Sequence, residues 1–105
     1  TSRDYTGFYV NIATEHLADV MKLEADRMQA LSPKPDDFKR EREVIIEERR
    51  ARVDNDPASQ LFEQMDAALY LNHPYSIPTI GWKHEMEGLN WDDIKPFHKT
   101  FYQPN

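Results

Sequence analysis

The spacing of hydrophobic positions changes after the first 13 residues, and the change predicts one strand followed by helices. Over residues 5–13, Phe8, Val10 and Ile12 alternate with their neighbours, as is typical of a half-buried strand. From residue 14 onward, apolar residues recur at steps of three, four and seven, which is typical of helices that pack along one face.

Residues that favour helix ends divide the rest of the chain into four predicted helices. Thr14 is a candidate cap for the first, and Pro35 suits the first turn of the second. Residues 72–81 contain two prolines and a glycine and are predicted to form an ordered loop. Asn90 is a candidate cap for the last helix, because Asp93 three residues later resembles a capping box. The helices are predicted over about 14–31, 35–55, 58–71 and from Asn90 onward.

About four helices and one clear strand predict a mostly helical segment of the α+β class. A single strand cannot satisfy its own backbone hydrogen-bonding groups. Further strands are therefore expected outside this segment, or the strand is expected to pair between chains.

Composition narrows the classes of partner. The chain has 13 lysine and arginine residues against 19 aspartate and glutamate residues, a formal net charge of −6, which argues against nucleic acid and anionic membrane surfaces. It has no apolar run long enough to span a membrane and no cysteine. A charged fraction of 30% predicts that part of the core comes from elsewhere. The opening residues resemble neither a signal peptide nor an initiator methionine, so a longer parent protein is expected.

Glu41 and Glu48 are the best candidates for chemistry. They are seven residues apart, so on a helix they share one side, about 10 Å apart along the axis. Phe38 and Ile45 lie on the same side. A carboxylate within an apolar stripe must be paired, hydrogen-bonded or bound to something, because burying an unpaired charge is costly.

Two interpretations of this pair remain open on spacing alone. One carboxylate could bind zinc while the other orients it. Alternatively, Glu48 could form an ion pair with Arg52 four residues later, with Arg42 and Arg49 nearby. Spacing favours the ion pair, because structural pairs are common on helices.

Other polar residues give weaker signals. Glu24 lies within the apolar stripe of the first helix and is expected to form a salt bridge or to meet a partner helix. The four histidines are not spaced for a helical metal site, so none is expected to be a ligand. These are His16, His73, His84 and His98.

Several segments, in order along nearly the whole chain, resemble the pitrilysin (insulinase) family of zinc metallopeptidases, the inverted-motif group, and particularly its bacterial members. Residues 1–6 resemble the family segment N-A-x-T-S-x-D-x-T, truncated at its start. Residues 41–48 resemble the helix that supplies the distal zinc ligand. The match continues at residues 23–28, 54–57, 73–75, 80–81 and 102–105.

The resemblance implies roles for four residues. Glu48 matches the distal zinc ligand, and Glu41 matches a second glutamate that assists catalysis without being a standard ligand. Thr1 and Ser2 match the end of an edge strand that holds a peptide or protein substrate in an extended conformation. The adjacent Glu47 points about 100° away from Glu48 on a helix. Residues 1–105 are then part of a single α+β peptidase domain, truncated at both ends.

One departure from the family limits these expectations. The family's H-x-x-E-H motif, which supplies two zinc ligands and the general base, does not occur in the 105 residues. Zinc is therefore expected in the intact parent and not in this segment, which is expected to be inactive alone. Two alternatives stay open: a non-catalytic partner subunit homologous to the peptidase, and an unrelated helical interaction module. Because the predicted strand leaves unpaired edges, homodimerisation or strand exchange is also expected.

Overall fold

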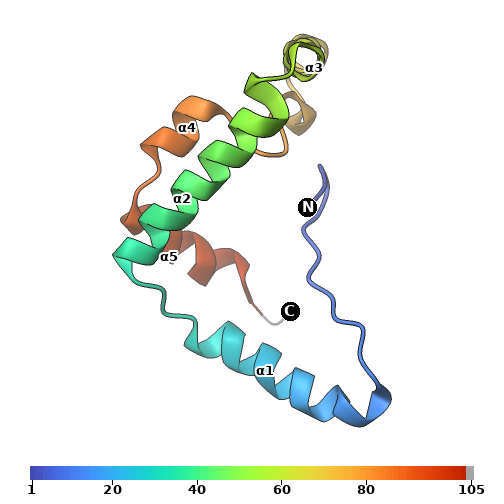
Figure 1. Cartoon of the computed structure of the whole chain (residues 1–105), viewed down its shortest axis with the longest axis vertical. Coiled ribbons are helices and arrows are strands. Elements are labelled where there is room, and N and C mark those ends of the chain that lie inside the picture. Colours follow the sequence, from blue (N-terminus) through green and yellow to red (C-terminus); the bar gives the residue numbers. More distant parts are fainter. Residues whose placement is uncertain (104–105) are drawn as a thin grey trace.

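The computed structural model describes residues 1–103, which form helices joined by short connections (Figure 1). The radius of gyration is 17.1 Å, whereas a compact domain of about 100 residues has about 13 Å. The helices accordingly enclose an open arch, and the N-terminal segment runs back along its open side. The elements are a 3₁₀ turn Thr14–His16, α1 (Leu17–Ala30), α2 (Pro35–Arg49), a π-helical turn Arg50–Asp54, α3 (Pro57–Leu69), a 3₁₀ turn Pro74–Ser76, α4 (Lys83–Gly88) and α5 (Trp91–Phe101).

The strand predicted over residues 5–13 is not formed, and residues 1–103 contain no strand. The segment is an exposed coil, because a strand needs a neighbouring backbone to pair with. The residues just before it are fastened to the helices: Arg3 pairs with Asp66 of α3, and the Tyr75 hydroxyl donates to the Asp4 carboxylate at 2.6 Å. The described residues are thus helical, and the predicted sheet is not among them.

Local end signals set the bounds of three of the five α-helices. Pro35 is the first residue of α2, as predicted. Asn90 caps α5: it accepts a hydrogen bond from the Asp92 N–H at 2.9 Å, and Asp93 accepts one from the Asn90 N–H at 2.9 Å. Asp56 caps α3, accepting from the Ser59 N–H at 2.9 Å. These contacts are local in sequence, which is why the starts of α2 and α5 could be predicted from Pro35 and Asn90.

Two predictions about helices were wrong or incomplete. Thr14 does not cap the first helix, because it is the first residue of a 3₁₀ turn that precedes α1. The short helix α4 was not predicted, since its six residues are too few to show helical periodicity. The second and third predicted helices agree with α2, its π-helical extension and α3 within two residues.

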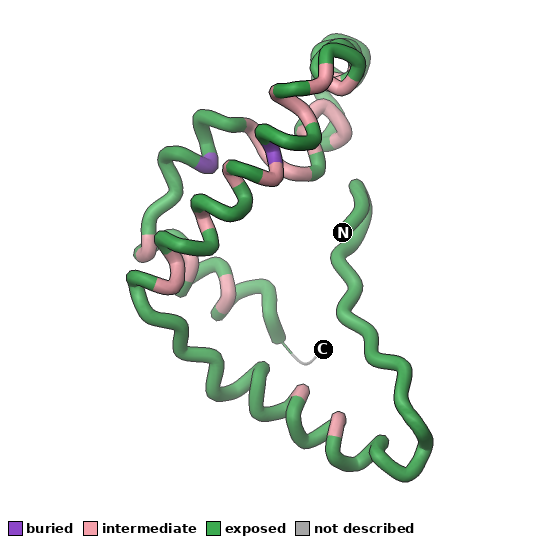
Figure 2. Tube along the Cα trace, in the orientation of Figure 1, coloured by how far each residue is buried: buried purple, intermediate pink, exposed green. Residues whose placement is uncertain are grey.

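Very little of this chain is enclosed. Among residues 1–103 only Met86 of α4 and Arg49 of α2 are buried, and most of the tube in Figure 2 is coloured as exposed. Large apolar side chains such as Phe8, Leu61 and Phe62 are exposed by more than half. No helix in the described part of the chain combines the length and the hydrophobicity that a bilayer span requires.

Candidate metal site

The candidate zinc ligand Glu48 lies near the C-terminal end of α2, on a partly open surface. A Glu48 carboxylate oxygen is 3.0 Å from Arg52 Nη1, so the predicted ion pair is confirmed. The Glu48 side chain is 42% exposed and that of Arg52 is 74% exposed. Such exposed pairs contribute about 0–1 kcal/mol, so a stronger ligand for the carboxylate could replace Arg52.

The two arginines expected near Glu48 bind elsewhere. Arg42 donates to the Leu89 carbonyl at 3.0 Å, which connects α2 to the segment between α4 and α5. Arg49 turns toward α3 and the loop that precedes α4. Arg52 is therefore the cation that contacts Glu48, and the other two fasten the helix to its neighbours.

The Arg49 side chain is enclosed by partners from three segments. Its two terminal nitrogens donate to the two carboxylate oxygens of Glu63 in α3, both at 2.8 Å. One of them also donates to the Gly81 carbonyl at 2.8 Å, and Nε lies 3.4 Å from the Asp54 carboxylate. The hydrogen bonds to Glu63 raise the pKa of Arg49, while burial opposes this shift. A guanidinium with these partners stays charged and fixed in orientation.

Sequence reasoning missed the role of Arg49. It stands in a run of charged residues, which normally indicates a solvated helix face. Its partners Glu63 and Gly81 are 14 and 32 residues away, so no local spacing connects them to it. The one sequence signal near this contact is Gly81. Its φ of +91° is a conformation that favours glycine, and its carbonyl accepts a hydrogen bond from Arg49.

Glu41 lies at the edge of an apolar pocket of about 280 Å³ between α2, α4 and α5. The side chain is exposed, and no ion pair to it is found among residues 1–103. The apolar stripe of α2 faces this pocket, and the ring of Phe38 meets that of Trp91 edge to face at 6.2 Å. The pocket is lined chiefly by Phe38, Ile45, Met86, Leu89, Trp91 and Ile94. Glu41 thus places a carboxylate beside apolar walls.

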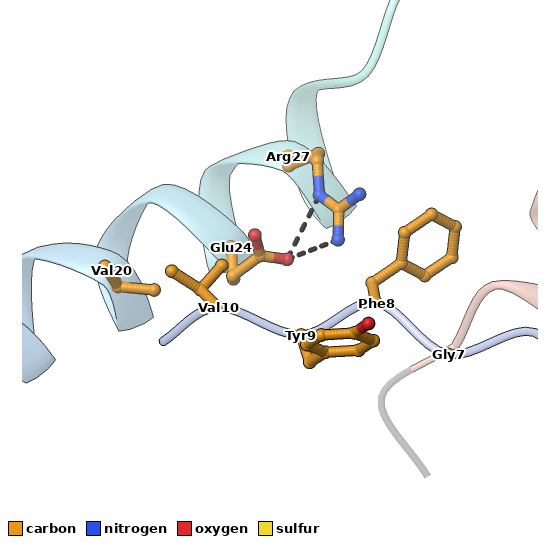
Figure 3. Close-up of a pocket in the computed structure, with 7 residues that line it drawn as sticks. All are labelled: Gly7, Phe8, Tyr9, Val10, Val20, Glu24 and Arg27. Carbon is orange, nitrogen blue, oxygen red and sulfur yellow. Dashed lines mark hydrogen bonds and ion pairs between the residues drawn. The ribbon is translucent and has the colours of Figure 1, made fainter. Parts of the chain in front are cut away.

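The predicted ion pair of Glu24 is also confirmed, on α1. Glu24 accepts from Arg27 Nε at 3.1 Å, and the guanidinium of Arg27 lies 4.8 Å from the centre of the Phe8 ring. Figure 3 shows this pair facing the N-terminal segment across an open pocket, with Val10 opposite Val20. The contacts hold part of the predicted strand segment next to α1.

Thr1 and Ser2 lie at the exposed N-terminal end of the same segment. The Ser2 N–H donates to the Tyr5 carbonyl at 2.8 Å, which makes a turn rather than an extended edge. The neighbouring Arg3 anchors this end to α3 through Asp66. The structure does not bring Thr1 and Ser2 into contact with Glu41 or Glu48 through any hydrogen bond found in residues 1–103.

The donor chemistry near Glu48 fits one ligand of a zinc ion. Zinc accepts carboxylate oxygens but takes three or four protein ligands. Within residues 1–103 no three histidine, cysteine, aspartate or glutamate side chains are grouped to hold a metal. Glu48 can therefore supply a single, accessible carboxylate. The last two residues of the predicted match at 102–105 lie outside the described residues.

Comparison with known proteins gives one family. Residues 1–83 match the profile of Insulinase (Peptidase family M16). Over 99% of this chain, zinc protease PqqE of Helicobacter pylori is 36% identical, and the aligned part is 23% of that protein. Uncharacterized zinc protease YmxG of Bacillus subtilis is 25% identical over 100% of this chain and 25% of its own length. The probable mitochondrial-processing peptidase subunit beta of Schizosaccharomyces pombe is 27% identical over 98% of this chain and 22% of its own length. The chain thus spans about a quarter of the relatives it matches.

Proposed function

Because the chain belongs to the insulinase family of peptidases, peptidase family M16, we propose that it is part of the catalytic domain of a zinc-dependent endopeptidase. The observation that carries the proposal is the pair Glu41 and Glu48, two turns apart on one side of α2 and within the matched residues. Relatives named zinc proteases support hydrolysis of peptide bonds and zinc as the metal.

In this proposal Glu48 supplies one carboxylate ligand to the metal. Its present partner is the exposed Arg52, and a surface pair of this kind opens easily. Zinc, when bound, polarises the scissile carbonyl and activates water. The further ligands and the general base come from an H-x-x-E-H motif elsewhere in the parent protein.

Glu41 and the N-terminal segment have supporting roles in the proposal. Glu41 adds negative charge on the same side of α2 without binding the metal directly. In the complete domain, Thr1 and Ser2 would form the end of an edge strand that holds the substrate by backbone pairing, which requires the turn closed by Ser2 and Tyr5 to open. Residues 5–13 are exposed along their whole length, so their backbone groups can join a sheet in the complete α+β domain.

Three matched glutamate-to-glutamine variants of the whole protein test these roles. E48Q is expected to lose bound zinc and peptidase activity, because the amide is a poor zinc ligand. E41Q is expected to keep zinc and to hydrolyse peptides more slowly. E47Q is the control, since Glu47 is paired with Arg50 on a different side of α2. Full zinc content in E48Q, or equal loss of zinc in E47Q, would refute the assignment of Glu48.

The 105-residue chain tested alone is expected to hydrolyse no peptides and to hold no zinc tightly, since one carboxylate is too few ligands. Zinc analysis after dialysis and a peptide cleavage assay check both points. Stoichiometric zinc retained after dialysis would contradict the proposal that the remaining ligands lie elsewhere.

A second candidate is a non-catalytic subunit of the same family. The relative named mitochondrial-processing peptidase subunit beta supports a protein that works as part of an assembly. The presence of both Glu41 and Glu48 favours the enzyme instead. The parent sequence upstream of Thr1 separates the candidates: an intact H-x-x-E-H motif supports the peptidase, and its absence supports the non-catalytic subunit.

A further inference from the structure

Arg49 directly follows the proposed zinc ligand and is the one buried charged residue among residues 1–103. Its side chain is 7% exposed, against 42% for Glu48 and 51% for Arg50 on either side. An arginine is rarely enclosed in this way, because removing the charge from water is costly unless it is paired. Both terminal nitrogens of Arg49 are hydrogen-bonded, whereas its buried Nε makes no hydrogen bond within residues 1–103 and lies 3.4 Å from the Asp54 carboxylate. The local fold is therefore built around its position.

The partners of Arg49 connect the end of α2 to two other parts of the chain. The two hydrogen bonds to Glu63, both 2.8 Å, form a two-point fork that fixes the plane of the guanidinium against α3. The bond to the Gly81 carbonyl adds the loop before α4. Together these contacts determine how the last turn of α2 is rotated about its own axis.

This rotation matters because the regular helix ends at the same place. Arg50 begins a π-helical turn, in which the backbone bonds change from i→i+4 to i→i+5. The backbone ladder alone therefore constrains the last turn less tightly than it does the middle of a helix. Glu48 and Arg49 are joined by one peptide bond, so fixing the Arg49 side chain also fixes the direction in which Glu48 leaves the helix.

We propose that Arg49, held by Glu63 and Gly81, is a positioning residue that sets the direction of the Glu48 carboxylate. This inference rests on the proposed function, in which Glu48 is a zinc ligand. Arg49 does not touch the metal or the substrate. Residues that orient a metal ligand in this way typically change metal affinity by about 10–100-fold when replaced.

The test compares R49M with R50M in the whole protein. Both variants replace an arginine with methionine at adjacent positions, one at the end of α2 and one at the start of the π-helical turn. Arg50 is exposed, and among residues 1–103 its ion pair is with Glu47. Zinc affinity is measured by competition with a chelator, at a temperature at which circular dichroism shows each variant to be folded. R49M is expected to bind zinc about 10–100-fold more weakly, and R50M is expected to be within about twofold of the unchanged protein. Absorption of the cobalt-substituted protein should change in R49M alone.

A purely structural role for Arg49 predicts a different result, namely a lower melting temperature of R49M with unchanged zinc affinity in the folded protein. That outcome would overturn the inference. If R49M does not fold, R49K decides, because it keeps the buried charge and loses the two-point fork; unchanged zinc affinity in R49K would equally overturn the inference. E48Q distinguishes failure of the proposed function from failure of this inference. Zinc retained by E48Q refutes the proposed function. Zinc lost by E48Q but fully kept by R49M refutes only the positioning role of Arg49.

Discussion

Removing Glu63 should destabilise the junction of α2 and α3 far more than removing an exposed glutamate. In E63M, Arg49 would remain buried and would lose both hydrogen bonds to Glu63, keeping its bond to the Gly81 carbonyl and the longer contact of its Nε with the Asp54 carboxylate at 3.4 Å. Breaking a buried ion pair from one side costs about 3–5 kcal/mol, and the remaining contact of Arg49 with Asp54 places E63M near the lower end of that range. The two hydrogen bonds from Arg49 to Glu63 lead to a similar figure, because each is charge-assisted and contributes about 1.5–3 kcal/mol.

The double variant R49M/E63M should recover most of this loss. Replacing both charges with apolar side chains of similar volume leaves no buried charge behind, and such replacements are often neutral. The Gly81 carbonyl loses its donor, but Gly81 is only partly buried, so water can take the place of the guanidinium. We therefore expect a coupling energy between the two positions of at least about 2 kcal/mol.

Hydrogen exchange of the α3 amide groups in the whole protein measures the free energy of local opening directly. E47M serves as the control, because Glu47 is exposed and its replacement should change this free energy by less than about 0.5 kcal/mol. If E63M lowers the free energy of local opening by less than about 1 kcal/mol, or if the effects of R49M and E63M simply add in the double variant, Arg49 and Glu63 do not form a strongly coupled buried pair.

Three further outcomes follow from the structure. Replacing the cap residue in N90A should destabilise α5 by about 1 kcal/mol, as judged by hydrogen exchange of the α5 amides, with N72A in a loop as the control. The hydrogen bonds from Ser59 lower the pKa of Asp56 below 3.8, so Asp56 stabilises α3 above about pH 4, and this contribution should vanish as pH falls through the folded-state pKa. Acid titration of D56N, followed by circular dichroism, should lack that component, and an unchanged acid transition would refute it. The 105-residue chain should dimerise or exchange strands through residues 5–13, and a strictly monomeric chain in light scattering at high concentration would contradict this.

Helix positions could be predicted from this sequence because their end signals are short-range. Pro35 and the pair Asn90 and Asp93 act within three or four residues, and α2 and α5 begin where those residues predict. Thr14 has the composition of a cap, but the chain turns through a 3₁₀ segment there and its side chain caps nothing. A residue type therefore predicts a helix start only when the surrounding backbone takes the capping conformation.

Features that depend on distant segments could not be predicted in the same way. Alternation over residues 5–13 indicates which side chains could face a core. A strand forms only when it pairs with a neighbouring strand, and residues 1–103 contain no strand for it to pair with. The site shows the same limit. Spacing along the helix predicted that Glu41 and Glu48 share one side and that Glu48 pairs with Arg52. The partners of Arg49 come from α3 and from the loop before α4, so no local spacing could predict them.

The two ion pairs at the end of α2 differ in a way that fits opposite roles. Glu48 and Arg52 are exposed by 42% and 74%, so solvent screens their attraction and the pair can open when a metal competes for the carboxylate. Arg49 and Glu63 are exposed by 7% and 10%, so opening them would leave charges in an enclosed site. A metal ligand must be able to leave its resting ion-pair partner, whereas a residue that orients the ligand must keep its own partners. The ion-pair and zinc-ligand interpretations of Glu48 are therefore compatible, because the weak pair leaves the carboxylate available. In our proposal, the enclosed pair of Arg49 and Glu63 next to it holds the direction of that carboxylate.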